Sequence, residues 1–475
     1  MVTRLHCGIL VALTASVTAL SAGCDEATTT GTGGSSSSSS SGSAGEGGTA
    51  GVGGMGGTAG TGGGGGTAGA GGAKVAPDLD PSLTWHPQNR DKLDTFIDEV
   101  GVNGANYDPT KKPVAIFDWD NTVIKNDIGD IMFFYQVKND KIMQPPNKDW
   151  NTTSRYLTKE AATALDAACG SLADAGKPLP TSTNAACADE LISVYVDAKT
   201  TGGDAAYSGW NYRTMEPAYA WVAQLQAGYT TDELKGFAKT ALEAALAEAV
   251  GASQTVGTKS VNAWLRIYDQ IADLIDVMQQ NGFDVWVVSA SSQPIVEAFA
   301  EKVGIAADHV VGIRTVKDVS DKHTYDLVGC GSVPDGSDNG GNPMGNSMIT
   351  YIEGKRCWMN KVIYGVSGAA AEQTNPDMAK RPAFGAGDSD TDISFLHDAT
   401  HLKLALNRNK KELMCNAYGN YMGKWIINPM FIEPKGMLGA GYACSTNACK
   451  DAAGVGVPCK NEAGEVIPDQ MDTVY

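Results

Sequence analysis

Two aspartates one residue apart are the side chains in this sequence whose types and spacing are best suited to chemistry. Asp118 and Asp120 end an apolar run that starts at Pro113, and Thr122 adds a hydroxyl two residues later. Two carboxylates this close repel each other unless a cation joins them, so the stretch predicts a divalent metal ion. A continuous apolar run is typical of a strand that is buried on both faces. The carboxyl end of such a strand is where open α/β sheets bind their ligands.

Polar residues follow later apolar runs in the same way. Ser289 ends a second run, and a third run ends in a glycine followed by Asp388 and then Asp392. A serine before a helix can bind phosphate oxygens together with the next backbone amide, although such a serine is ordinarily only a helix cap. We also expect a positively charged side chain at the same site. Lys361, which opens a helix with apolar periodicity, is the expected residue, and Lys355 is the alternative.

These elements, in this order, resemble the motifs of the haloacid-dehalogenase-like hydrolase superfamily, and the resemblance extends over residues 110–407. It implies that Asp118 is a nucleophile that forms an aspartyl-phosphate and that Asp120 is the general acid and base. It also implies a Mg²⁺ ion held by Asp118, the backbone carbonyl of Asp120 and Asp388, with Asp392 supporting the metal site. The second aspartate indicates a phosphatase or phosphomutase rather than a dehalogenase.

The resemblance also gives roles to six residues around these carboxylates. The residues expected to bind the phosphate group are Thr122, Ser289, Ala290 and Lys361. Asn126 and Asp127 follow the first motif directly and are expected to touch the substrate or the hinge of a cap domain.

The segment that starts at Ser289 is similar to the second motif of the phosphoserine-phosphatase-like branch of this superfamily. Within that branch, residues 118–122, 387–392 and 407–411 resemble the exported phosphorylcholine phosphatases of bacteria. The resemblance implies Mg²⁺-dependent hydrolysis of a small organic phosphate such as phosphorylcholine. Two alternatives stay open, namely a phosphotransferase or phosphomutase of the same fold, and a non-catalytic surface binding protein.

The elements that must position these residues alternate between apolar strands and helices. This alternation predicts an α/β fold with a doubly wound, parallel, Rossmann-like sheet. Residues 76–124 and 283–407 are expected to form the catalytic core, and residues 408–475 a cysteine-containing tail packed on it. Residues 125–282 show helical periodicities without a strand-like run, so they predict a large helical cap inserted after the first strand.

The beginning of the chain predicts export. Residues 1–24 combine a basic start, a short apolar stretch and small residues before Cys24, which is typical of a lipoprotein-type signal peptide. Residues 25–75 are mostly Gly, Ser, Thr and Ala with few charges, a composition that predicts a disordered linker. We therefore expect a lipoprotein anchored at Cys24 that faces the periplasm or cell surface, or alternatively a secreted protein.

The eight cysteines beyond the signal form an even set, which predicts disulfides in an exported chain. We expect local pairs between Cys169 and Cys187 and between Cys330 and Cys357. The four tail cysteines are expected to pair among themselves, and they are Cys415, Cys444, Cys449 and Cys459.

The net charge argues against one class of partner. The chain carries a formal charge of −18 and has no Lys/Arg-rich patch, so nucleic acid is not expected to bind. A small phosphorylated substrate is the expected partner, and contact with a membrane is expected only through the lipid anchor. The oligomeric state is left open.

Overall fold

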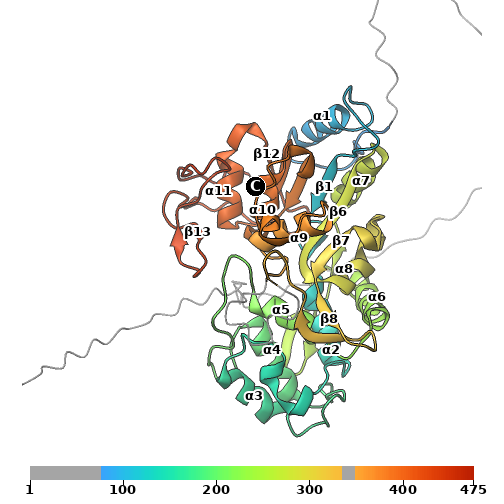
Figure 1. The fold of residues 1–475 in the computed structure, drawn as a ribbon, viewed down its shortest axis with the longest axis vertical. Coiled ribbons are helices and arrows are strands. Elements are labelled where there is room, and N and C mark those ends of the chain that lie inside the picture. Colours follow the sequence, from blue (N-terminus) through green and yellow to red (C-terminus); the bar gives the residue numbers. More distant parts are fainter. Residues whose placement is uncertain (1–75, 334–347, 475) are drawn as a thin grey trace, which may run out of the picture. The chain divides into compact units, whose positions relative to one another are not determined.

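The computed structural model describes residues 76–333 and 348–474 (Figure 1). The signal peptide predicted for residues 1–24, its Cys24 and the linker predicted for residues 25–75 lie outside the described residues. Those expectations therefore stay predictions.

A six-stranded parallel sheet forms the centre of the fold. Its strands, in their order across the sheet, are β12 (Trp425–Pro429), β11 (Leu402–Asn407), β10 (Phe384–Gly387), β1 (Val114–Phe117), β6 (Asp284–Ser292) and β7 (Val310–Ile313). From β1 the chain moves outward to β6 and β7 and then returns to build β10, β11 and β12 on the other side. This topology confirms the expected doubly wound sheet, and its switch point lies between β1 and β10.

Side chains of β1 alternate between two hydrophobic clusters, one on each face of the sheet. Ala115 and Phe117 belong to the cluster that contains α1 (Asn89–Val100), α7 (Asp269–Gln280) and α8 (Gln293–Ala300). Val114 and Ile116 belong to the cluster that contains α9 (Glu353–Val362), α10 (Ile393–Asp398) and α11 (Lys411–Gly419). Because both faces are covered, the strand is apolar at every position.

The segment between β1 and β6 forms the inserted cap. Its helices are α2 (Ile128–Lys138), α3 (Lys159–Cys169), α4 (Ala185–Val196), α5 (Pro217–Gln224) and α6 (Thr231–Ala247). The expectation of a cap without strands is wrong, because two short antiparallel pairs lie at its base. These pairs are β2 (Ile124–Lys125) with β5 (Arg266–Ile267), and β3 (Ser253–Val256) with β4 (Lys259–Asn262).

The tail contributes to the sheet itself. Strand β12 pairs with β11 from Lys403 opposite Trp425 to Asn407 opposite Pro429, so the sheet continues past the predicted core boundary at residue 407. The remaining strands are short hairpin partners, β8 (Thr315–Lys317) with β9 (His323–Leu327) and β13 (Cys449–Lys450) with β14 (Gly456–Val457).

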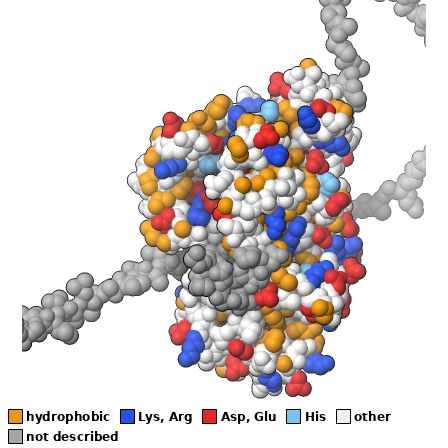
Figure 2. All heavy atoms as spheres, in the orientation of Figure 1, with side chains coloured by type: hydrophobic (Ala, Val, Ile, Leu, Met, Phe, Trp, Pro, Cys, Tyr) orange, Lys and Arg blue, Asp and Glu red, His pale blue; other side chains and the backbone are white. Residues whose placement is uncertain are grey.

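Disulfides join all eight cysteines beyond the signal in the expected groups. The pairs are Cys169–Cys187, Cys330–Cys357, Cys415–Cys444 and Cys449–Cys459. The two predicted local pairs are confirmed, and the tail cysteines pair among themselves. In the described part of the chain, no helix combines the length and apolar character that crossing a bilayer requires. On the face shown in Figure 2, side chains of both charges are interspersed.

Candidate active site

The topological switch point brings the carboxyl ends of three strands to one edge of the sheet. Phe117 of β1 is paired with Val287 of β6 on one side and with Ala386 of β10 on the other. The residues that follow these positions therefore emerge together. Asp118 and Asp388 are two of them, although they are far apart in the sequence.

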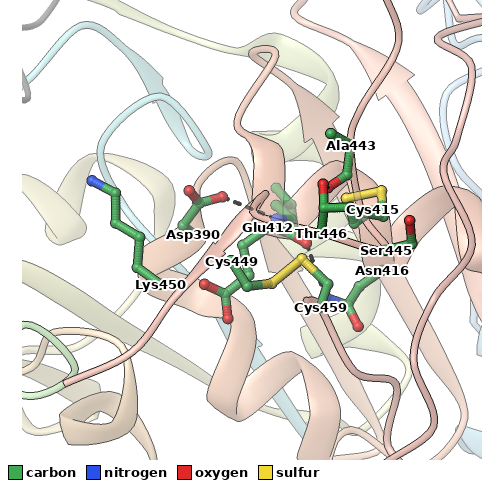
Figure 3. Close-up of a disulfide and its surroundings, with 12 residues drawn as sticks. Asp390, Glu412, Cys415, Asn416, Ala443, Ser445, Thr446, Cys449, Lys450 and Cys459 are labelled. Carbon is green, nitrogen blue, oxygen red and sulfur yellow. Dashed lines mark hydrogen bonds between the residues drawn. A yellow bond between two sulfur atoms is a disulfide. The ribbon is translucent and has the colours of Figure 1, made fainter. Parts of the chain in front are cut away.

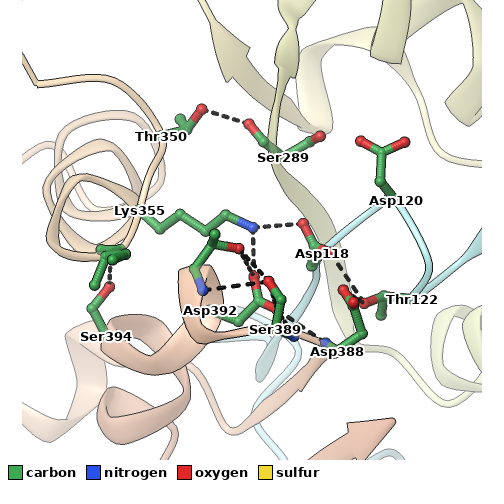
Figure 4. A network of polar contacts seen from close by, with 12 residues as sticks. Asp118, Asp120, Thr122, Ser289, Thr350, Lys355, Asp388, Ser389, Asp392 and Ser394 are labelled. Atoms are coloured by element: carbon green, nitrogen blue, oxygen red, sulfur yellow. Dashed lines mark hydrogen bonds and ion pairs between the residues drawn. The ribbon is translucent and has the colours of Figure 1, made fainter. Parts of the chain in front are cut away.

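Asp118 is held from two directions. Its Oδ1 accepts a hydrogen bond from Lys355 Nζ at 2.5 Å, and its Oδ2 accepts one from Thr122 Oγ1 at 3.1 Å (Figure 4). Burial, and then the charge of Asp392, raise the pKa of Asp118 well above its usual value in spite of Lys355. The same carboxylates outweigh the burial of Lys355 and raise the pKa of its ammonium group. The lysine therefore stays charged and counters the buried carboxylates.

The lysine at this site is Lys355, and the expectation that Lys361 would reach the carboxylates is wrong. Helix α9 begins at Glu353, so Lys355 lies in its first turn and its side chain is fully buried. Lys361 lies in the last turn of the helix. Its Nζ donates to the carbonyl of Gly329 at 2.7 Å.

Asp392 orients the lysine and closes the turn after β10. Its Oδ1 accepts from Lys355 Nζ at 2.6 Å, and its Oδ2 accepts from the backbone amides of Asp388 and Ser389, both at 3.0 Å. A Cβ at Gly387 would lie 2.6 Å from the Asp392 side chain, so only glycine fits there. Asp392 thus supports the site by holding both Lys355 and the turn after β10.

Asp120 lies on the other side of Asp118 from the lysine (Figure 4). Its Oδ1 accepts from the amide of Ile128 at 2.8 Å, and its Oδ2 accepts from Ser291 Oγ at 2.7 Å. Burial and the nearby charge of Asp127 raise the pKa of Asp120 well above its usual value. A raised pKa suits a group that must hold a proton and then release it.

Ser289 lies within β6, above the pair formed by Lys355 and Asp118 (Figure 4). Its Oγ accepts from the amide of Ser291 at 3.1 Å, and its carbonyl oxygen accepts from Thr350 Oγ1 at 2.5 Å. Ala290 lies between the two serines in the strand. The structure thus places the expected serine at the site.

Ser291 and Arg408 are polar residues of the site for which the sequence analysis predicts no role. Ser291 binds the second aspartate, and Arg408 Nη1 lies 2.5 Å from Asp388 Oδ2. The repeated serines from Ser289 to Ser292 were a signal for the former. Arg408 lies in the stretch 407–411 that resembles phosphorylcholine phosphatases, but that resemblance led to no predicted role for it.

Asn126 and Asp127 connect the first motif to the cap. Asn126 has a left-handed backbone with φ of 74°, and its Nδ2 donates to the carbonyl of Trp264 at 3.0 Å. Asp127 caps helix α2 by accepting from the amide of Asp130 at 3.1 Å. Asn126 therefore lies at the connection between the first motif and the cap, whereas Asp127 lies close enough to raise the pKa of Asp120.

The carboxylates of the site fit a divalent cation. One oxygen each of Asp118, Asp388 and Asp392 lies within 4.8 Å of the others, and all three residues are buried. Together with Asp120 they carry four formal negative charges, against the two positive charges of Lys355 and Arg408. A Mg²⁺ ion, which prefers oxygen ligands, would balance that charge. The carboxylates of Asp118, Asp388 and Asp392 each accept hydrogen bonds on both oxygens, so hydrogen bonding does not rank them as ligands.

Comparisons with known proteins agree with this geometry. Residues 205–397 match the model of the haloacid dehalogenase-like hydrolase family. Phosphorylcholine phosphatase of Pseudomonas aeruginosa is 26% identical over 205 residues, which are 41% of this chain and 56% of that protein. The chain therefore matches little more than half the length of this curated relative.

Two solved structures are similar over longer stretches. A conserved protein of unknown function from Anaerococcus prevotii is 20% identical, with a TM-score of 0.49, and the match covers 74% of this chain and 93% of that one. A substrate-bound phosphoserine phosphatase is 14% identical, with a TM-score of 0.27, and the match covers 62% and 86% of the two chains.

The matched family range contains Lys355, Asp388 and Asp392 but begins after the first motif. The sheet supplies the missing part, because β1 pairs with β10 and β6 and places Asp118 against those three residues. Residues 205–397 are thus similar to the haloacid dehalogenase-like hydrolase family, and β1 adds Asp118 to that part of the chain.

Proposed function

We propose that the protein is a Mg²⁺-dependent phosphomonoesterase that works through an aspartyl-phosphate on Asp118. One observation carries the proposal. A buried carboxylate at a strand end has a buried lysine 2.5 Å away on one side, and on the other a second carboxylate, Asp120, with a raised pKa. This arrangement supplies a nucleophile, a charge to hold a phosphate group and a proton donor.

In the first half of the reaction, an oxygen of Asp118 attacks phosphorus as the bond to the leaving alcohol breaks. Asp120 donates its proton to the leaving oxygen, and the ammonium group of Lys355 stabilises charge on the phosphoryl oxygens. A Mg²⁺ ion bound to Asp118, Asp388 and the carbonyl of Asp120 would offset repulsion between the nucleophile and the phosphate.

In the second half, water attacks the phosphorus of the aspartyl-phosphate. Asp120, now a carboxylate, takes a proton from that water, and the bond between Asp118 and phosphorus breaks to release inorganic phosphate. The hydrogen bonds from Ile128 and Ser291 hold both oxygens of Asp120, so the same group can serve in both halves.

We further propose a substrate whose alcohol part is cationic, such as phosphorylcholine. The charges of Asp127 and Asp130 on α2 lie near enough to raise the pKa of Asp120. The ring of Tyr195 lies next to them, with its hydroxyl 2.7 Å from Asp130 Oδ1. Carboxylates and aromatic rings beside the leaving oxygen favour a quaternary ammonium group. Similarity to phosphorylcholine phosphatase supports the same substrate class.

The reaction is tested by measuring phosphate release from phosphorylcholine with the full-length protein. Turnover should require Mg²⁺ and should be lost in Asp118→Asn. The Asp120→Asn variant should release about one equivalent of p-nitrophenol from p-nitrophenyl phosphate and then stall, because that leaving group needs no proton whereas the second step does. Full activity of Asp118→Asn would contradict the mechanism.

Two further measurements separate the alternatives. Transfer of the phosphate to an added alcohol, without free phosphate, would show a phosphotransferase instead. The preference for phosphorylcholine over phenyl phosphate, whose alcohol part is uncharged, should fall in Asp130→Asn. An unchanged preference would reject the proposed recognition of a cation.

We also propose that the protein is exported and anchored by a lipid on Cys24. Four disulfides suit an oxidising compartment and support export. Incorporation of labelled palmitate that disappears in Cys24→Ser would support the anchor, and an unlabelled protein released from the cells would contradict it.

A further inference from the structure

Arg213 belongs to the cap insertion, but the side chains that it binds belong to the core. Its Nη1 lies 2.9 and 2.8 Å from the two carboxylate oxygens of Glu412 on α11, and its Nη2 lies 2.8 Å from Glu353 Oε1 on α9. The arginine side chain is 17% exposed and that of Glu412 is 8% exposed. A planar guanidinium in such a fork geometry fixes both partners.

The backbone of the same cap segment holds the approach to α9. The amide of Glu353 donates to the carbonyl of Arg213 at 2.9 Å, and the amide of Ile349 donates to the carbonyl of Thr214 at 3.2 Å. Glu353 is the first residue of α9, and Lys355 lies two residues further in the same turn. The cap segment therefore contacts the turn that carries the lysine of the active site.

The tail supports this segment from another side. Arg213 Nη1 lies 3.3 Å from the carbonyl of Lys450, and the amide of Tyr212 donates to the carbonyl of Ala452 at 2.9 Å. Figure 3 shows Lys450 next to the Cys449–Cys459 disulfide and in the same region as Glu412. The disulfide thus stiffens a loop to which the cap is tied.

We propose that Arg213 is a positioning residue for Lys355, so that this edge of the cap is a fixed part of the catalytic scaffold. The proposal rests on the proposed function, because it assumes that Lys355 holds the phosphoryl group. The segment around Arg213 does not open with the cap. Substrate must enter elsewhere.

The test compares Arg213→Met with Arg266→Met. Arg266 is a matched control in the cap, because among the described residues its guanidinium donates to backbone carbonyls of the cap, at Leu246, Leu265 and Glu248, and lies over the ring of Trp264. We expect Arg213→Met to lower kcat by about ten-fold or more with KM changed by less than about three-fold, since a shifted lysine affects the transition state most. Orthovanadate inhibition should weaken in parallel. Arg266→Met should change neither value.

A second readout does not need turnover. Amide hydrogen exchange in α9 should accelerate in Arg213→Met, while exchange in α3, which is remote from the contact, stays as in the wild type. Arg213→Lys should fall between the wild type and Arg213→Met, because lysine restores the charge but not the fork. If Arg213→Met does not fold, Glu353→Gln removes the charge on α9 that Arg213 and Arg356 both bind, and leaves the pair of Arg213 and Glu412 in place.

Two results would overturn the proposal. One is unchanged exchange in α9 of a folded Arg213 variant. The other is an equal loss of activity in Arg213→Met and Arg266→Met. Absence of phosphate release by the wild type would instead defeat the proposed function, and the exchange experiment would still report whether Arg213 holds α9.

Discussion

The ammonium group of Lys355 touches two carboxylates and is fully shielded from water. Such a group cannot be removed without leaving Asp118 and Asp392 buried next to each other without a nearby counter-charge. The two lysines on α9, Lys355 and Lys361, therefore differ in the groups that their ammonium groups contact. Lys361 bonds to a carbonyl and lies over the ring of Trp358 at 4.7 Å, away from the carboxylates.

Replacing each of these lysines by methionine should separate them. We expect Lys355→Met to lower kcat/KM by about 10²–10³-fold, because a preorganised positive charge at the phosphate is lost. Lys361→Met should stay within about three-fold of the wild type. Steady-state kinetics at saturating Mg²⁺ measures both, with circular dichroism as the control for folding. Equal losses in the two variants would mean that α9 contributes no specific charge.

A carboxyl group in the cap provides a pH prediction. Burial raises the pKa of Glu216 to about 7, in spite of the charge of Lys450. The folded state then keeps a proton that the unfolded state releases above about pH 4.5, so stability falls as pH rises from about 4.5 through 7. Glu216→Gln should remove that contribution. The melting temperature of this variant should fall less than that of the wild type between pH 5 and 8. Calorimetry measures both, and parallel curves of melting temperature against pH would contradict this expectation.

At the scale of elements, the position of Lys355 depends on where helix α9 begins. Gly354 follows the first residue of the helix, and a Cβ there would lie 1.7 Å from the carbonyl oxygen of Ile349. The preceding loop folds back so closely that only a glycine fits. The start of this helix is thus set by the fold of the loop that precedes it.

Two glycine substitutions in helices should have opposite effects. Gly354→Ala should lower the free energy of unfolding by about 2 kcal/mol or more and reduce activity, because the clash is with backbone and must displace α9. Gly236→Ala in α6 meets no atom within 4 Å and should stabilise the protein by about 0.5–1 kcal/mol. Urea unfolding measures both. A neutral Gly354→Ala would show that the loop before α9 yields freely.

Because the start of α9 depends on the loop before it, only part of the site could be predicted from the sequence. The motifs at Asp118 and Asp388 could be predicted because each follows its strand directly. Hydrophobic periodicity and turn residues indicate where such strands end. Lys355 was not preferred over Lys361, because apolar periodicity marks the body of α9 but not its start. Strand β12 lies in the stretch predicted as a tail packed on the core. Its place in the sheet depends on β11.

At the scale of the whole molecule, one disulfide joins two helices of the cap and another holds helix α9 of the core. Cys169–Cys187 joins α3 to α4 in the cap, whereas Cys330–Cys357 ties α9 to the segment after β9. Cys357 lies two residues from Lys355 on the same helix. The two bridges should therefore stabilise the fold alike but affect catalysis differently.

Removing each bridge by a double substitution to alanine tests this difference. Both variants should lose about 3–4 kcal/mol of stability, because the closed loops are of similar length. Well below the melting temperature, only the Cys330→Ala/Cys357→Ala variant should have a lower kcat. Thermal unfolding and kinetics of both proteins provide the comparison. An equal kcat in the two variants would contradict a role for the bridge in placing α9.

The pairing of β1 also has a consequence for how the protein is made. Ala115 pairs with Val285 on one side and with Phe384 on the other, so the central strand must wait for two distant segments to be synthesised. Closing such long loops slows folding, whereas the cysteines of the cap are close enough in sequence to pair early. A nascent chain thus carries Asp118 early, yet the carboxylate cluster around Asp118 cannot assemble until β10 and the residues that follow it have been translated.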